Sequence, residues 1–408
     1  MKILFLGIKE WPANSGVNRA GGTGSYCDLL IEGFKDEVQS IIITQKSRHR
    51  KKYESSKSVS VYRIETISNR VYKLVVGNFW CALKAYSLLQ KKKVDIIHAH
   101  TGWSILYAYF LAKFTKTPLV ATPHGDPYGY YEYTIRQPLP FLFIKLIKLI
   151  ANHIFPKADA LVVFTEEDKR NLLEHTKAQF DNLRIIETGV KLPAIRKLDN
   201  FKGRKIKILY VGRLTASKGV DRLIKSLTKL DKPLLAGIHV DIVGSGEDEV
   251  KLRQLCGRHK LDEQVTFHGF IEHSKIDSFY QTADVFLFPS FVEGFSLALL
   301  EAMSFGLACV VNDYGLPFDR DEILLTENND PETIATVLTK LLANPELISQ
   351  YGRRARDIIE RNYSQEMFAK KYIDLYEEAA KHVDSQPMSI FSKTLRLSFQ
   401  RSEAEENL

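Results

Sequence analysis

Long uncharged apolar segments are missing from this sequence. No stretch of its 408 residues approaches the roughly 20 apolar residues that a membrane-spanning helix needs. The apolar run at residues 3–7 is too short for a signal peptide, and Lys9, Glu10 and Trp11 follow it directly. We therefore expect a cytoplasmic protein that is neither secreted nor membrane-spanning.

Cysteine is also scarce. Cys27, Cys81, Cys256 and Cys309 are far apart, form no C-x-x-C pair and have no histidine at the spacing of a zinc site. They are interpreted as buried thiols in a reducing compartment. We expect no disulfide, no metal site and no cofactor.

The composition is that of a globular protein with an uneven charge. Hydrophobic residues make up 45% and charged residues 26%, and the length suits two domains. Residues 1–195 contain 28 Lys and Arg against 17 Asp and Glu, a net +11, whereas the remainder contains 29 against 32, a net −3. The basic half suits anionic lipid headgroups or phosphorylated substrates, or it is simply a solvated surface.

Short apolar runs alternate with helical patterns along both halves. This alternation predicts parallel sheets covered by helices on both faces. In the first half we expect strands at 3–7, 39–44, 59–64, 95–100, 119–123, 160–165 and 183–187, and helices at 25–35, 73–90, 104–113, 139–155 and 166–175. In the second half we expect strands at 207–211, 239–243, 265–269, 285–288 and 309–312, and helices at 219–230, 248–259, 274–282, 296–305, 331–343 and 345–361.

The predicted fold is therefore α/β, with two doubly wound Rossmann-like domains that face each other across a cleft. The first domain spans residues 1–192, a linker 193–205, and the second domain 206–363. A final helix at 364–383 is expected to cross back to the first domain. The tail at 384–408 is either disordered or a weak amphipathic anchor.

Cations follow a predicted strand of the second domain. Gly212 and Arg213 come directly after the strand, and Lys218 precedes the next helix. A glycine lets the backbone approach a ligand, and a helix N-terminus offers N–H groups to an anion. Arg213 and Lys218 thus suit a diphosphate, although solvated surface cations are the alternative.

Further glycine turns follow at Gly244 and Gly246 and at Gly269. They do not form a dinucleotide fingerprint, because Glu249 stands where the third glycine belongs. After the next strand, a loop carries Glu293, and Ser296 can cap the helix that holds Glu301. Both carboxylates can face one cleft and accept hydrogen bonds from sugar and ribose hydroxyls.

These segments resemble the retaining GT-B glycosyltransferases of family 4. The resemblance rests on Glu293 and Glu301 with seven residues between them, on G-R-L-x-x-x-K-G at 212–219, and on A-D-V-F-x-x-P-S at 283–290. It is strong over residues 206–312 and weaker elsewhere. One departure is the loop after Asn312, which has a single glycine, Gly315, where the family usually has two and a glutamate. The identity of the donor sugar therefore stays undetermined by the sequence.

The resemblance implies a role for each matching position. Arg213 and Lys218 would neutralise the leaving diphosphate, Glu293 would hold the donor sugar, and Glu301 the ribose. The backbone at Gly269, Phe270 and Ile271 would contact the base, and that at Gly294, Phe295, Ser296 and Leu297 further hydroxyls. A glycine loop at Gly21, Gly22 and Gly24 would cover the phosphates, and His124 would lie beside the sugar. His98 and His100 either line the cleft or belong to the core.

The sequence thus predicts a retaining, metal-independent glycosyltransferase with a UDP-, GDP- or ADP-sugar donor and a saccharide or lipid-linked acceptor. The apolar segment at 139–155, which carries two lysines, is either a helix packed on the sheet or a surface for peripheral contact with an anionic membrane. Other GT-B enzymes, such as an epimerase, and a non-catalytic sugar- or nucleotide-binding protein are the alternatives. We expect no nucleic-acid partner, because aromatic and basic residues do not interleave as in known modules.

Overall fold

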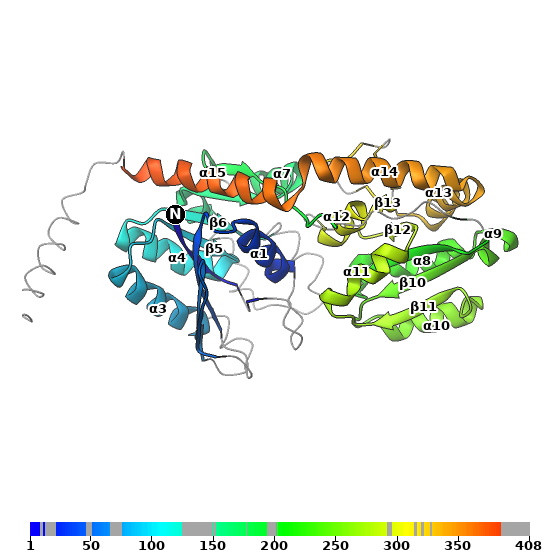
Figure 1. Cartoon of the computed structure of the whole chain (residues 1–408), viewed down its shortest axis with the longest axis horizontal. Helices are drawn as coiled ribbons and strands as arrows, with labels where there is room; N and C mark the ends of the chain where they lie inside the picture. Colours follow the sequence, from blue (N-terminus) through cyan, green and yellow to red (C-terminus); the bar gives the residue numbers. More distant parts are fainter. Residues whose placement is uncertain are drawn as a thin grey trace, which may run out of the picture.

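The computed structural model shows two lobes that lie side by side along the long axis of the molecule (Figure 1). Each lobe is built around one largely parallel sheet, so the predicted pair of α/β domains is confirmed. The structure describes residues 1–8, 11–12, 22–45, 51–65, 76–124, 149, 152–176, 178–193, 201, 203–291, 296–313, 316–319, 322–326 and 329–384.

The sheet of the first lobe has the strand order β3-β4-β2-β1-β5-β6-β7-β8. Adjacent strands are parallel, except that β3 pairs antiparallel with β4. The strands are β1 (Lys2–Leu6), β2 (Gln39–Gln45), β3 (Tyr53–Ser55), β4 (Val59–Ile64), β5 (Ile96–His100), β6 (Leu119–Thr122), β7 (Ala160–Val163) and β8 (Leu183–Ile185).

Helices cover both faces of this sheet. Along β1, Ile3 and Phe5 pack in one core and Leu4 and Leu6 in the other, because successive side chains of a strand point to opposite faces. The helical segments are α1 (Gly22–Gly33), α3 (Asn78–Lys91), α4 (Gly102–Thr115), η2 (Phe155–Lys157) and α7 (Glu166–His175). Helix α1 belongs to the first core, and α3, α4 and α7 belong to the second.

The sheet of the second lobe is parallel throughout its described pairs, in the order β11-β10-β9-β12-β13-β14. Its strands are β9 (Ile206–Val211), β10 (Ile238–Val243), β11 (Val265–Gly269), β12 (Val285–Phe288), β13 (Ala308–Asn312) and β14 (Leu324–Thr326). Its helical segments are η3 (Ala216–Lys218), α8 (Val220–Leu227), α9 (Lys232–Ala236), α10 (Glu249–His259), α11 (His273–Thr282), α12 (Leu297–Ser304), α13 (Pro331–Ala343) and α14 (Pro345–Asn362).

The last helix, α15 (Gln365–Asp384), follows α14 but packs on the first lobe. Tyr372 and Tyr376 of α15 are fully buried in the core that contains α1. At the crossing, the Val190 N–H donates to the Tyr363 carbonyl at 2.8 Å, and the Gln365 N–H donates to the Val190 carbonyl at 3.0 Å. Figure 1 shows α14 and α15 end to end along one edge of both lobes.

The elements that were not expected are short: β3, η2, η3, α9 and β14 have three to five residues each. Most of the helix expected at 139–155, and the tail after residue 384, lie outside the described residues. Within the part of the chain that is described, no helix is long and apolar enough to cross a membrane. All four cysteines are buried and unpaired, as predicted.

Candidate functional site

Three strand-end turns meet in the second lobe. The Gly212 N–H, after β9, donates to the Val243 carbonyl at 3.0 Å, and the Gly244 N–H, after β10, donates to the Gly269 carbonyl at 2.8 Å. Gly244 has a φ of 138°, and a Cβ there would lie 1.8 Å from the Gly212 carbonyl oxygen. Only glycine fits this contact, so glycine at position 244 allows the ends of β9, β10 and β11 to lie close together.

The loop between β9 and α8 is anchored to the end of β12. The Phe291 N–H donates to the Ser217 carbonyl at 2.9 Å. Gly219 has a φ of 65°, and a Cβ there would lie 2.0 Å from the Pro289 carbonyl oxygen. The loop is therefore fixed by close backbone contact as well as by a hydrogen bond.

This loop carries both cations predicted to bind diphosphate. The Arg213 side chain is exposed, whereas Lys218 at the end of η3 is only 9% exposed. Helix α8 begins two residues after Lys218. The first N–H groups of a helix have no carbonyl acceptor within the helix, because no helical residue precedes them by four positions. An exposed arginine, a largely buried lysine and a helix N-terminus thus occupy one strand end, an arrangement suited to phosphate oxygens.

The predicted carboxylate Glu301 lies on α12, whose N-terminus is capped by Ser296. The Ser296 hydroxyl accepts the Leu299 N–H at 3.4 Å. The Tyr280 hydroxyl, from α11, donates to Glu301 Oε2 at 2.9 Å. Burial, with the Glu301 charge, raises the pKa of Tyr280 well above its usual value, so Tyr280 stays a donor and orients the carboxylate. No motif or spacing in the sequence points to Tyr280.

Other predicted ligand contacts of the second lobe have different surroundings. Phe270, directly after β11, is 54% exposed, and Ile271 packs against the core of this lobe. Leu297, the first residue of α12, packs against the core of the first lobe. The N-terminus of α12 therefore lies where the two lobes meet. Glu293, Gly294 and Phe295 lie outside the described residues.

In the first lobe, His124 follows β6 with a φ of 61°, a conformation uncommon for residues other than glycine. Its Nε2 shares a hydrogen bond of 2.8 Å with Nδ1 of His100. The Tyr26 ring meets the His124 ring edge-on at 4.8 Å. Removal of water from the ring lowers the pKa of His124 to about 3, so this imidazole is neutral at physiological pH.

His98 and His100 do not line a cleft, because both side chains are completely buried. His98 Nδ1 lies 2.6 Å from the Tyr376 hydroxyl, and His98 Nε2 lies 2.9 Å from Thr122 Oγ1. The core interpretation thus holds for His98, whose two ring nitrogens bond to β6 and α15. Burial lowers the pKa of both histidines well below the usual value.

The glycine loop expected after the first strand is shorter than predicted. Gly22 and Gly24 belong to the first turn of α1, which begins three residues before the predicted start at Ser25. Glycine is tolerated there because that first turn makes few intrahelical hydrogen bonds. Gly21 lies outside the described residues.

Solved structures with the same architecture define the class. Sucrose-phosphate synthase from Thermosynechococcus elongatus superposes with a TM-score of 0.79 and 21% identity, covering 92% of this chain and 98% of the other. Anabaena Alr3699/HepE in complex with UDP and glucose gives a TM-score of 0.71 and 17% identity, covering 92% and 99%. Two parallel-sheet lobes with a C-terminal helix returning to the first define a GT-B glycosyltransferase fold.

The sequence comparisons give the family. Residues 20–192 match the description Glycosyltransferase Family 4, and residues 193–358 match Glycosyl transferases group 1. The uncharacterized glycosyltransferase MJ1069 of Methanocaldococcus jannaschii is 29% identical, over 78% of this chain and 84% of the relative. Alpha-monoglucosyldiacylglycerol synthase of Acholeplasma laidlawii is 24% identical, over 72% and 79%. The chain belongs to glycosyltransferase family 4, and it is a glycosyltransferase.

Proposed function

We propose that this enzyme transfers a sugar from a nucleotide-diphosphate donor to a saccharide or lipid-linked saccharide, with retention of the anomeric configuration. Cell-surface polysaccharide or glycolipid synthesis at the inner face of the membrane is the process that fits. Arg213 and Lys218 bind the diphosphate, Glu301 binds the ribose, and Glu293 and His124 hold the donor sugar.

The position of Lys218 beside Arg213 carries this proposal. Both cations stand on the loop after β9, which is fixed against Pro289 and leads into the N-terminus of α8, and this combination suits phosphate oxygens. When the bond between the anomeric carbon and the diphosphate breaks, negative charge accumulates on the leaving group. Fixed cations and N–H groups stabilise that negative charge, and they provide this stabilisation in place of a metal ion. The departing phosphate then accepts the acceptor hydroxyl proton.

A nucleotide-sugar donor is supported by the HepE structures, which were solved with UDP and glucose and with UDP-glucose. The exposed Phe270 follows the Gly269 turn, where a base can be contacted by backbone groups and stacked on the ring. The base is identified by a donor-hydrolysis screen across UDP-, GDP- and ADP-sugars. Proton NMR of the product then distinguishes retention from inversion.

Replacement of Lys218 by alanine tests the proposal. We expect kcat to fall roughly a hundredfold, the usual effect of removing one charge-stabilising group, about 3 kcal/mol. Lys225→Ala is the matched control, since Lys225 is an exposed residue of α8 that pairs with Asp221 at 2.9 Å. Equal activity of the two variants refutes the role of Lys218. Release of an epimer without an acceptor, or nucleotide-sugar binding without any turnover, indicates the alternatives.

Membrane contact is proposed through an apolar surface on α3 and α4 of the first lobe, which pack on each other. Its large side chains are 39–75% exposed, and lysines follow both helices. The surface comprises Phe79, Trp80, Leu83, Tyr86, Phe110 and Phe114. Apolar side chains beside cations suit an anionic bilayer surface. The name of the Acholeplasma laidlawii relative, a diacylglycerol glucoside synthase, supports a lipid acceptor.

Vesicle sedimentation tests this surface. We expect the protein to bind anionic vesicles at low salt and not neutral ones, and we expect Trp80→Glu with Phe114→Glu to abolish binding. Val250→Glu is the control, because Val250 is 67% exposed on α10 of the second lobe. Vesicle binding that survives the double substitution shows that another surface is used.

A further inference from the structure

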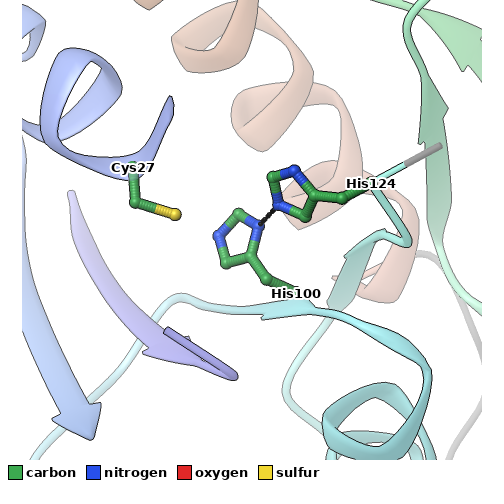
Figure 2. A group of neighbouring side chains, drawn as sticks. All are labelled: Cys27, His100 and His124. Atoms are coloured by element: carbon green, nitrogen blue, oxygen red, sulfur yellow. Dashed lines mark hydrogen bonds between the residues drawn. The ribbon is translucent and has the colours of Figure 1, made fainter. Parts of the chain in front are cut away.

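A thiol and two imidazoles converge in the first lobe, at the edge where the donor sugar is proposed to bind. One ligand atom each of Cys27, His100 and His124 lies within 4.8 Å of the other two. Figure 2 shows the three side chains pointing toward one another: Cys27 from α1, His100 from the end of β5, and His124 from the segment that follows β6. Cys27 and His100 are fully buried, and His124 is partly exposed.

The hydrogen bonds of this cluster are incomplete. His100 Nδ1 bonds to His124 Nε2, but the other ring nitrogen, His100 Nε2, is buried and has no hydrogen-bond partner among the described residues. That nitrogen is turned toward the Cys27 side chain (Figure 2). Buried polar atoms without partners are rare in native proteins, and each calls for an explanation.

Thiolate sulfur and neutral imidazole nitrogen are the ligands that Zn²⁺ prefers. Tetrahedral Zn²⁺ with bonds of about 2.0–2.3 Å places its ligands roughly 3.5 Å apart. The longest separation of 4.8 Å must therefore shorten by about 1 Å, and the partly exposed His124 can make that movement.

We propose that Cys27, His100 and His124 form a binding site for Zn²⁺ or a chemically similar ion, and that occupancy inhibits the enzyme. The ion displaces the Cys27 proton to solvent and takes a ring nitrogen of His124, which removes this imidazole from the donor sugar. The fourth position faces the exposed side of His124 and holds water. Inhibition rests on the proposed function, whereas binding does not.

Binding is tested with the full-length protein, stripped of metal and titrated with Co²⁺. We expect one equivalent to bind with a cobalt–thiolate charge-transfer absorption, and Zn²⁺ to remove that absorption by displacement. Cys27→Ser should abolish the absorption and weaken Zn²⁺ binding to a competing chromophoric chelator at least about tenfold. Cys81→Ser is the matched control, since Cys81 is a buried thiol on α3 outside this cluster. An absorption that Cys27→Ser leaves unchanged, or none in the native protein, overturns the site.

Inhibition is tested separately in the transferase assay. Zn²⁺ should inhibit the native enzyme, a chelator should restore its activity, and Cys27→Ser should need at least about tenfold more Zn²⁺ while its activity without metal stays native. Equal inhibition of the two proteins overturns the regulatory claim. If no nucleotide-sugar is turned over by either protein, the proposed function fails, and the cobalt titration still decides the metal site.

Discussion

Replacing Gly219 by alanine tests whether close backbone contact sets the position of Lys218. At a φ of 65°, an alanine costs roughly 1–2 kcal/mol, offset by about 0.4–1 kcal/mol from a less flexible unfolded chain. Its Cβ would also lie 2.0 Å from the Pro289 oxygen, so the loop or the end of β12 must move by about 1 Å. Overpacking of this kind typically costs about 1–3 kcal/mol. We expect the free energy of unfolding to fall by about 3 kcal/mol, and kcat/KM to fall roughly a hundredfold because the cation is displaced.

Gly203→Ala is the matched control for this substitution. Gly203 has a φ of 73°, but a Cβ there would have no atom within 4 Å, so this variant carries the conformational cost without the overlap. We expect it to lose about 1 kcal/mol or less and to keep native activity. Urea unfolding followed by circular dichroism, together with donor turnover, measures both effects. If the two variants lose the same stability and the same activity, the contact with Pro289 does not position the loop.

Two further substitutions probe hydroxyl groups that only the structure identifies. Tyr280→Phe removes the donor to Glu301, and we expect the KM for the nucleotide-sugar to rise about tenfold or more with folding intact, since bonds to charged groups contribute about 1.5–3 kcal/mol; an unchanged KM would falsify the orienting role. In the native protein the hydroxyls of Tyr26 and Tyr372 lie 2.5 Å apart, and Tyr372→Phe removes this partner of Tyr26. It should lower the free energy of unfolding by about 1–3 kcal/mol in urea titrations, and unaltered stability would show that the contact contributes nothing.

The fold was predictable because strands near the centre of each sheet are buried on both faces. Runs such as residues 41–43 and 285–288 are continuous apolar segments between helical patterns, and that rhythm specifies a parallel sheet without knowledge of strand order. The unexpected segments were missed because they combine three to five residues with no long apolar run, which is too little for hydrophobic periodicity to distinguish helix from strand. The early start of α1 was missed because glycines at 22 and 24 favour a loop by propensity alone.

In the candidate site, too, some residues were predictable from the sequence and others were not, for a physical reason. Gly212, Gly244 and Gly269 were identifiable because each ends or directly follows a strand, and parallel strands end at one edge of a sheet. The convergence of Cys27 with His100 and His124 was not, because it depends on how α1 packs over β5 and β6, and the cysteine and the histidines stand at no recognisable metal spacing. Sequence spacing reveals a site when its residues share one element or one sheet edge. A site assembled by a helix that packs across the sheet becomes visible only through its contacts, and the unpartnered His100 Nε2 is such a contact-level signal.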